Sequence, residues 1–313
     1  MGVSFGKFIS PTFIHHNLYA TAQIYLGKMN SIPVRHINAT EKEPDFAGSF
    51  SIRDIDELLA GNDMVQELHR HDFFYILALK NGSGNHEIDF NPYAINGHSV
   101  FFMRPGQVHQ LLLKAGSTGY LLQFTSEFFS SNDKASNLLL HKAGSINHYK
   151  LDTDHFQKLF AILTYIYEEY TVKQERYEQV IKANMCILFI ELVRQQRNAS
   201  SSHASLYLQE RLEEFSALLE DNIFTCKHAA QYAAMMNLSV YQLNAITKAT
   251  LGKSCSELIN GQIILEAKRC LLATSHQINQ TAYRLGYEDV SYFIRFFKKH
   301  TGFSPEAFRH NYK

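Results

Sequence analysis

Between Glu266 and Lys313 the chain reads EAKRCLLATSHQINQTAYRLGYEDVSYFIRFFKKHTGFSPEAFRHNYK, and much of this pattern occurs once before. Residues 50 positions earlier carry the same kinds of side chain. The matching pairs are Ser239 and Asp289, Leu243 and Phe293, Ile246 and Phe296, Lys248 and Lys298, Gly252 and Gly302, Ser254 and Ser304, and Leu258 and Phe308. Two copies are too few for a solenoid, so we interpret them as two examples of one supersecondary unit.

Each copy has the features of a helix-turn-helix. A first helix is predicted to end at a residue that tolerates positive φ, Asn237 in one copy and Gly286 in the other. An N-cap residue, Ser239 or Asp289, then opens a second helix. In a helix-turn-helix this second helix leaves one face free for the major groove of DNA. Between the copies, residues 257–273 are predicted to form a long amphipathic helix that holds the two units at a fixed separation.

The free faces of the two second helices carry residue types that suit DNA. Arg can bridge guanine O6 and N7, Asn and Gln can pair with adenine, and Lys suits phosphates. The predicted DNA-contacting residues are Tyr241, Gln242, Asn244 and Lys248 in the first copy, and Ser291, Tyr292, Arg295, Lys298 and Lys299 in the second. A solvated surface would be the ordinary explanation for one copy, but two matching copies favour DNA binding.

Charge is divided unevenly along the chain. The formal net charge is zero, yet residues 223–313 hold 11 Lys and Arg against 5 Asp and Glu, a net of +6. The rest of the chain holds 19 against 25, a net of −6. The basic end is therefore where a polyanion is expected to bind.

The chain before residue 198 has a different character. Four short apolar or alternating runs predict strands in a barrel or sandwich, at residues 73–79, 86–90, 100–103 and 108–113. Apolar residues at spacings of three and four then predict two helices within residues 154–197. The small, polar stretch 198–205 is the predicted linker. We therefore expect an α+β protein with a barrel and helical domain at 1–197 and an all-α domain at 206–313.

The segment Glu266–Lys313 resembles the signature of the AraC/XylS family of transcription regulators, AxRLGYxDxSYFxRxFKKxxGxSPxxFR, and the resemblance extends back to about Ile223. It implies that Tyr292 and Arg295 contact bases, with Gln242 and Ala245 at the corresponding positions of the first copy. Many members have Arg where this chain has Ala245 and Phe where it has Thr247. The first helix is therefore expected to read fewer base edges than the second.

The N-terminal half more weakly resembles the cupin-like effector domain of that family. The residues that carry this resemblance are Leu68-His69-Arg70-His71-Asp72-Phe73 and Arg104-Pro105-Gly106-Gln107-Val108-His109. In metal cupins two His, a Glu and a later His bind the metal. His69, His71 and His109 match that pattern, but Tyr75 occupies the Glu position. We therefore expect no metal and no cofactor.

The histidines have two other interpretations, which sequence alone leaves open. They could orient a small molecule among apolar walls, with His69, His71, Tyr75, Phe102 and His109 as the predicted effector-binding residues. They could equally be hydrogen-bonded within the barrel and bind nothing.

The leading hypothesis is a ligand-responsive, non-enzymatic regulator that binds double-stranded promoter DNA as a homodimer paired through residues 154–197. RNA polymerase is a further candidate partner. No apolar run approaches the roughly 20 residues of a membrane helix, no secretory signal is visible, and the four cysteines are scattered, so we expect a cytoplasmic protein with no membrane partner. The alternatives are a metal-dependent cupin enzyme with a helical appendage, and a constitutive DNA binder whose barrel only dimerises.

Overall fold

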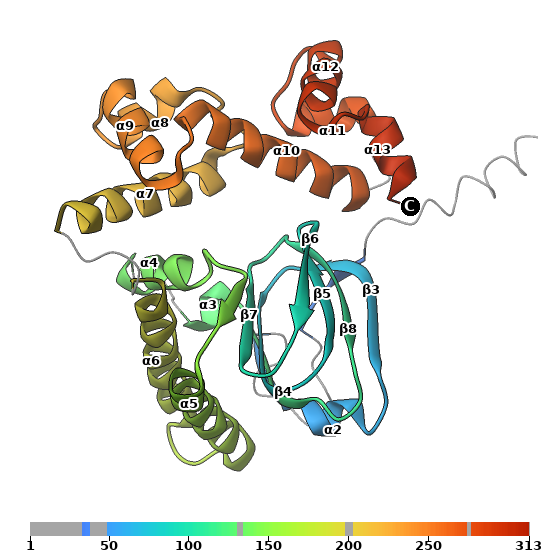
Figure 1. Ribbon diagram of the computed structural model, residues 1–313, viewed down its shortest axis with the longest axis vertical. Helices are drawn as coiled ribbons and strands as arrows, with labels where there is room; N and C mark the ends of the chain where they lie inside the picture. The colour runs from blue at the N-terminus through green and yellow to red at the C-terminus, as the bar shows by residue number, and fades with distance from the viewer. Residues whose placement is uncertain (1–32, 38–48, 130–133, 198–202, 274–276, 313) are drawn as a thin grey trace, which may run out of the picture. The chain divides into compact units, whose positions relative to one another are not determined.

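The computed structural model describes residues 33–37, 49–129, 134–197, 203–273 and 277–312. The predicted linker residues 198–202 lie outside this part. Within it, the chain forms a two-sheet β domain, a helical pair and a helical C-terminal third (Figure 1). The predicted α+β fold, with a β-rich N-terminal half and an all-α C-terminal domain, is confirmed.

The β domain consists of two five-stranded sheets. The first has the strand order β1-β3-β8-β5-β6, with bounds Val34–Arg35, Met64–His71, Val108–Leu113, Gly84–Ile88 and Asn91–Ile95. The second has the order β10-β7-β4-β9-β2, with bounds His148–Lys150, Ser99–Met103, Phe74–Asn81, Thr118–Phe124 and Phe50–Asp54. All four predicted strands are present, as β4, β5, β7 and β8.

Both faces of the second sheet are buried, and alternation along each strand sorts its side chains between two cores. Tyr75 on β4 and Phe101 on β7 lie in the core between the sheets. Their neighbours Ile76 and Phe102 face the opposite way, into a core shared with helices. These helices are α5 (Thr153–Val172) and α6 (Tyr177–Arg197), with α3 (Ser126–Phe129) and α4 (Lys134–Ala143) nearby; α2 (Ile55–Leu59) packs in the first core.

The C-terminal third contains seven helices among the described residues. They are α7 (His203–Asn222), α8 (Ala229–Met235), α9 (Val240–Leu251), α10 (Cys255–Ala273), α11 (Ile278–Arg284), α12 (Val290–Thr301) and α13 (Pro305–Asn311). They share one core, to which α7 contributes Phe215 and α12 contributes Phe293. Helix α7 begins at His203, so residues 203–205 of the predicted linker are helical. In the described part of the chain, no helix has the length and apolarity to cross a membrane.

The turns of both helix-turn-helix units have the backbone that their residues favour. Asn237 has φ 54° and Gly286 has φ 72°, both in the left-handed region. A Cβ at Gly286 would lie 2.5 Å from the carbonyl oxygen of Phe224, so only glycine fits there. This turn therefore depends on Gly286 both for its positive φ and for the close approach of the Phe224 backbone.

Candidate DNA-binding and effector sites

The second helix of each unit is capped by the residue that the sequence predicts. Ser239 Oγ accepts a hydrogen bond from Gln242 N at 3.2 Å, and Gln242 Oε1 accepts in return from Ser239 N at 2.8 Å. At the start of α12, Asp289 Oδ1 accepts from Ser291 N at 2.8 Å and from Tyr292 N at 3.1 Å. These caps determine where α9 and α12 begin, and hence which side chains face outward.

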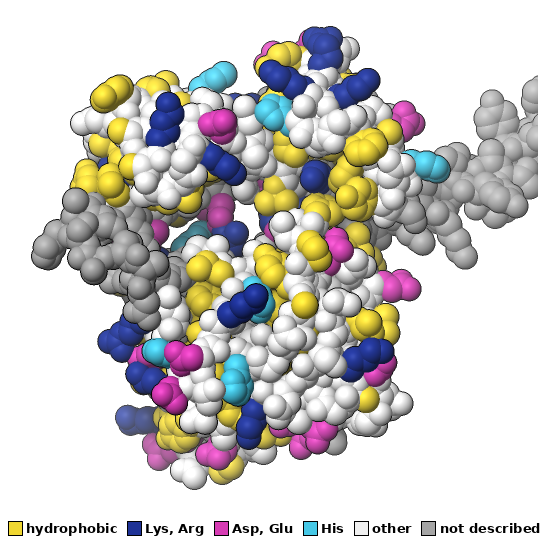
Figure 2. All heavy atoms as spheres, viewed as in Figure 1, with side chains coloured by type: hydrophobic (Ala, Val, Ile, Leu, Met, Phe, Trp, Pro, Cys, Tyr) yellow, Lys and Arg dark blue, Asp and Glu magenta, His cyan; other side chains and the backbone are white. Residues whose placement is uncertain are grey.

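Helix α12 presents all of its predicted DNA-contacting side chains to solvent. Phe293 and Phe297 are fully buried, which turns the opposite face of the helix outward. The exposed residues on that face are Ser291, Tyr292, Arg295, Lys298 and Lys299. The side chain of Arg295 is 68% exposed, and its guanidinium forms an ion pair with Asp289 at 3.8 Å. Figure 2 shows Lys and Arg side chains gathered over this helix.

Helix α9 presents only some of its predicted residues. Tyr241, Gln242 and Lys248 are exposed, and Tyr241 is 82% exposed. Asn244 differs, because its Oδ1 accepts from Cys255 N at 2.9 Å and its Nδ2 donates to Val240 O at 3.1 Å. Its amide therefore joins α9 to the start of α10 instead of pointing outward.

Three of the predicted effector-site residues converge inside the β domain. His69 and His71 lie two positions apart on β3, and His109 on β8 is the cross-strand partner of His69. The Nε2 atoms of His69 and His71 are 2.9 Å apart, those of His69 and His109 are 3.0 Å apart, and those of His71 and His109 are 3.4 Å apart. We refer to these three residues as the histidine cluster. All three are buried.

A fourth histidine adjoins this cluster and was not singled out from the sequence. His86 on β5 is fully buried, and its Nε2 lies 2.9 Å from Nδ1 of His109. Burial lowers the pKa of His86 and His71 to about 3 and that of His69 to about 4, and it holds the pKa of His109 well below its ordinary value. All four imidazoles are therefore neutral at pH 7. The feature of the sequence that could have identified His86 is the alternation of polar and apolar residues in β5.

A cavity of about 570 Å³ adjoins the cluster on one side. His71 and Tyr75 line it together with the polar side chains Arg35, Arg53 and Gln123. The remaining lining residues are Val34, His36, Leu58, Met64, Val65, Gln66, Phe73 and Leu121. Tyr75 Oη is buried and has no hydrogen-bond partner among the described residues. The two arginines were missed because the sequence around them predicted no element.

The prediction for Phe102 needs a correction. Phe102 is fully buried in the core that β7 shares with the helices, with its ring 5.7 Å from that of Phe189 on α6. Its neighbour Phe101 faces the histidines instead, with its ring 4.9 Å from that of His86. Successive side chains of a strand point to opposite faces, so the one-residue difference moves Phe102 out of the effector site.

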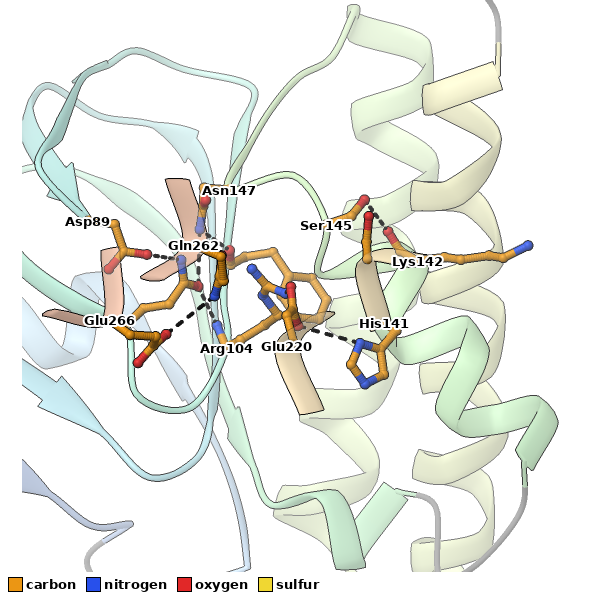
Figure 3. A network of polar contacts seen from close by, with 12 residues as sticks. Asp89, Arg104, His141, Lys142, Ser145, Asn147, Glu220, Gln262 and Glu266 are labelled. Carbon is orange, nitrogen blue, oxygen red and sulfur yellow. Dashed lines mark hydrogen bonds and ion pairs between the residues drawn. The ribbon is translucent and has the colours of Figure 1, made fainter. Parts of the chain in front are cut away.

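Polar contacts join the β domain to the helices. Arg269 Nε on α10 donates to Asp89 Oδ1 at 2.9 Å, and Gln107 Nε2 donates to Asp89 Oδ2 at 2.6 Å. Arg104 forms an ion pair with Glu220 of α7, which also faces His141 of α4 (Figure 3). One of these residues, Gln107, is also close to the histidine cluster in the sequence, since it lies two positions before His109.

Two family models match the chain. Residues 60–216, about half of the chain, match the AraC-like ligand binding domain, and residues 232–311 match a helix-turn-helix domain. Among curated proteins, the HTH-type transcriptional activator RhaS of Escherichia fergusonii is 25% identical over 249 residues, which cover 77% of this chain and 86% of that protein. RhaS of Klebsiella pneumoniae is 22% identical over 252 residues, with the same coverage. Among solved structures, unsaturated fatty acid bound ToxT from Vibrio cholerae is 18% identical, covers 83% of this chain and 95% of that one, and has a TM-score of 0.40.

Proposed function

Because the chain belongs to the AraC family of transcription regulators, we propose that it binds promoter DNA through α9 and α12 and that a small molecule in its β domain controls this binding. DNA binding is supported chiefly by the two capped helices, whose outward faces are exposed. On α12 this face carries Arg295, whose ion-pair partner Asp289 is as far as 3.8 Å away, and Lys298. An Arg can read guanine and a Lys can contact phosphate, so α12 is the stronger reader of the two.

We propose that the effector occupies the cavity beside His71 and Tyr75 and carries an anionic group. Arg35 and Arg53 line the same cavity, and a guanidinium pairs well with a carboxylate or phosphate. The unpartnered Oη of Tyr75 supplies a further hydrogen bond to such a ligand. Apolar side chains such as Leu58, Phe73 and Leu121 complete the walls, as is usual for small-molecule sites.

The route from this cavity to the DNA-binding helices runs along the start of β8. His109 belongs to the histidine cluster, whereas Val108, one residue before it, is fully buried in the core of the helical third. Gln107 and Asp89 then connect to Arg269 on α10. We propose that a ligand that moves His109 acts through these contacts on α10, the helix that spaces the two DNA-binding units.

The paired helices α5 and α6 are the proposed dimerisation surface, because they leave large apolar side chains exposed. These are Tyr165, Val172, Ile187 and Ile190. We further propose that the chain divides at the segment 198–202 into effector and DNA-binding domains. It acts without catalysing a reaction, in the cytoplasm where bacterial promoters are, with RNA polymerase as a partner at the promoter.

The test uses the full-length protein and DNA from upstream of its own gene. Fluorescence anisotropy should show binding to one duplex at least ~10³-fold tighter than to a scrambled duplex. A thermal-shift screen of small carboxylates and phosphates should then find a ligand that changes this affinity. Equal affinity for both duplexes would refute sequence-specific binding. Specific binding that no ligand changes would favour a constitutive binder.

A further inference from the structure

The histidine cluster has a geometry that a hydrogen-bonded core does not require. Three imidazole nitrogens from two strands meet at separations of 2.9, 3.0 and 3.4 Å. We propose that His69, His71 and His109 bind one divalent transition-metal ion through their Nε2 atoms. This proposal does not depend on the identity of the effector or on DNA binding.

The three distances suit a metal ion. Metal–nitrogen bonds of about 2.0–2.1 Å at tetrahedral angles place neighbouring nitrogens about 3.3 Å apart. A circle through the three Nε2 atoms has a radius of about 1.8 Å, so a point about 2.0–2.1 Å from all three lies just outside their plane. The ion therefore fits with small movements of the side chains.

Hydrogen bonds among the three histidines do not satisfy all three of their Nε2 atoms. A carbonyl oxygen only accepts, so the bond of 2.7 Å between His69 Nδ1 and Glu67 O requires the hydrogen of His69 to be on Nδ1. Nε2 of His69 then has a single lone pair, yet the Nε2 atoms of His71 and His109 both approach it. One lone pair accepts one good hydrogen bond, whereas a metal ion accepts a lone pair from each of the three atoms.

The surroundings of two of the three proposed ligands, His69 and His109, match those of a metal site, whereas the buried Nδ1 of His71 has no hydrogen-bond partner among the described residues. Metal-bound imidazoles usually donate their second N–H to a fixed acceptor. His69 donates to Glu67 O, and Nδ1 of His109 lies 2.9 Å from Nε2 of His86, which can accept from it.

The absence of a carboxylate does not exclude the ion. Tyr75 occupies the position of the carboxylate ligand of metal cupins, and on that ground the sequence predicts no metal. Three imidazoles form a sufficient set for Zn²⁺, and imidazole also suits Cu²⁺, Fe²⁺ and Ni²⁺. His71 also lines the neighbouring cavity, which offers water or a small anion a route towards the ion.

The test is direct metal binding by the full-length protein after treatment with a chelator. Calorimetry should show about one Zn²⁺ per chain, and Co²⁺ should give the visible absorption of a tetrahedral nitrogen site. His69→Gln and His109→Gln should each weaken binding at least ~100-fold, and His86→Gln, which alters the neighbour of a ligand, by about 10–100-fold.

Two controls keep the result specific. His148→Gln removes a half-buried histidine of the same domain outside the cluster and should leave affinity unchanged. The double variant His15→Ala/His16→Ala removes the adjacent pair near the N-terminus and should also bind normally. Circular dichroism checks that each variant folds. If the cluster variants fail to fold, X-ray absorption of the Co²⁺-loaded wild-type protein decides, with three imidazoles expected. No saturable binding, unchanged binding in folded cluster variants, or fewer than two imidazoles around Co²⁺ would each overturn the proposal.

Discussion

Arg269 and Asp89, which lie 180 residues apart in the chain, form a bidentate ion pair between α10 and the turn that follows β5. Nε donates to Oδ1 at 2.9 Å and Nη2 donates to Oδ2 at 2.5 Å, and both side chains are at least nine-tenths buried. The Asp89 carboxylate also accepts from Gln107 Nε2 and, more weakly, from Val108 N at 3.3 Å. This ion pair therefore connects the DNA-binding helices to the strand that carries His109.

Removal of the Arg269 guanidinium should destabilise the folded protein. We expect Arg269→Met to lower the free energy of unfolding by about 2–4 kcal/mol, because Asp89 keeps a buried charge and loses its cation. Chemical denaturation measures the change. Arg194→Met is the matched control, since Arg194 is 64% exposed in its pair with Glu191, and it should cost less than about 1 kcal/mol. Equal costs for the two variants would show that the Asp89 pair does not stabilise the fold.

Asn244 should matter for stability more than for DNA contact. Asn244→Ala leaves the N–H of Cys255 at the start of α10 without its acceptor, so we expect a loss of about 1–3 kcal/mol in thermal or chemical unfolding. Tyr241→Ala, which changes an 82% exposed side chain on the same helix, should leave stability nearly unchanged. If Asn244→Ala is as stable as wild type but binds DNA weakly, the amide reads bases after all.

The two second helices should contribute unequally to specificity. Arg295→Ala should weaken specific binding about tenfold or more, because a bidentate Arg–guanine contact discriminates by roughly 1–3 kcal/mol. Gln242→Ala should lose less specificity, since Oε1 already accepts from Ser239 and the side chain carries no charge. Gln242→Glu is the matched control, because it keeps the capping oxygen and removes the amide donor. Anisotropy titrations with specific and scrambled duplexes measure all three. A larger specificity loss for Gln242→Ala than for Arg295→Ala would make α9 the main reader.

Lys298 should act on affinity without regard to sequence. It is exposed on the last turn of α12, and a phosphate contact adds the same free energy for every duplex. Lys298→Ala should therefore weaken specific and scrambled duplexes alike and reduce the log–log salt slope by about one. Lys268→Ala is the control for the salt slope, because Lys268 lies over the rings of Phe90 and Phe308 and not on the exposed face of α12. An unchanged salt slope for Lys298→Ala would contradict the phosphate contact.

Where elements lie was largely predictable, because the relevant signals are local. The caps Ser239 and Asp289, the positive φ of Asn237 and Gly286, and the buried Phe293 all follow from side chains within a turn or two of one another. The strands β4, β5, β7 and β8 were likewise visible as short apolar or alternating runs between turns.

Which face a strand residue takes was not predictable in the same way. Phe101 and Phe102 are both aromatic and fully buried, and β7 is buried on both faces. The four residues after Ser99 are all apolar, so they show no alternation of polar and apolar side chains. Only the packing of α6 against the sheet shows that Phe102 belongs to the helical side. The same kind of packing, between α9 and α10, turns Asn244 inward.

The sequence by itself determined that this protein has two helix-turn-helix units after a β-rich half, because capping, turn chemistry and hydrophobic periodicity act over a few residues. Only the tertiary structure decided that His69, His71, His86 and His109 meet, that Arg35 and Arg53 face a cavity with Tyr75, and that Arg269 reaches Asp89. The physical reason is that these contacts depend on strand register and on how separate cores pack, and both bring together residues tens to hundreds of positions apart.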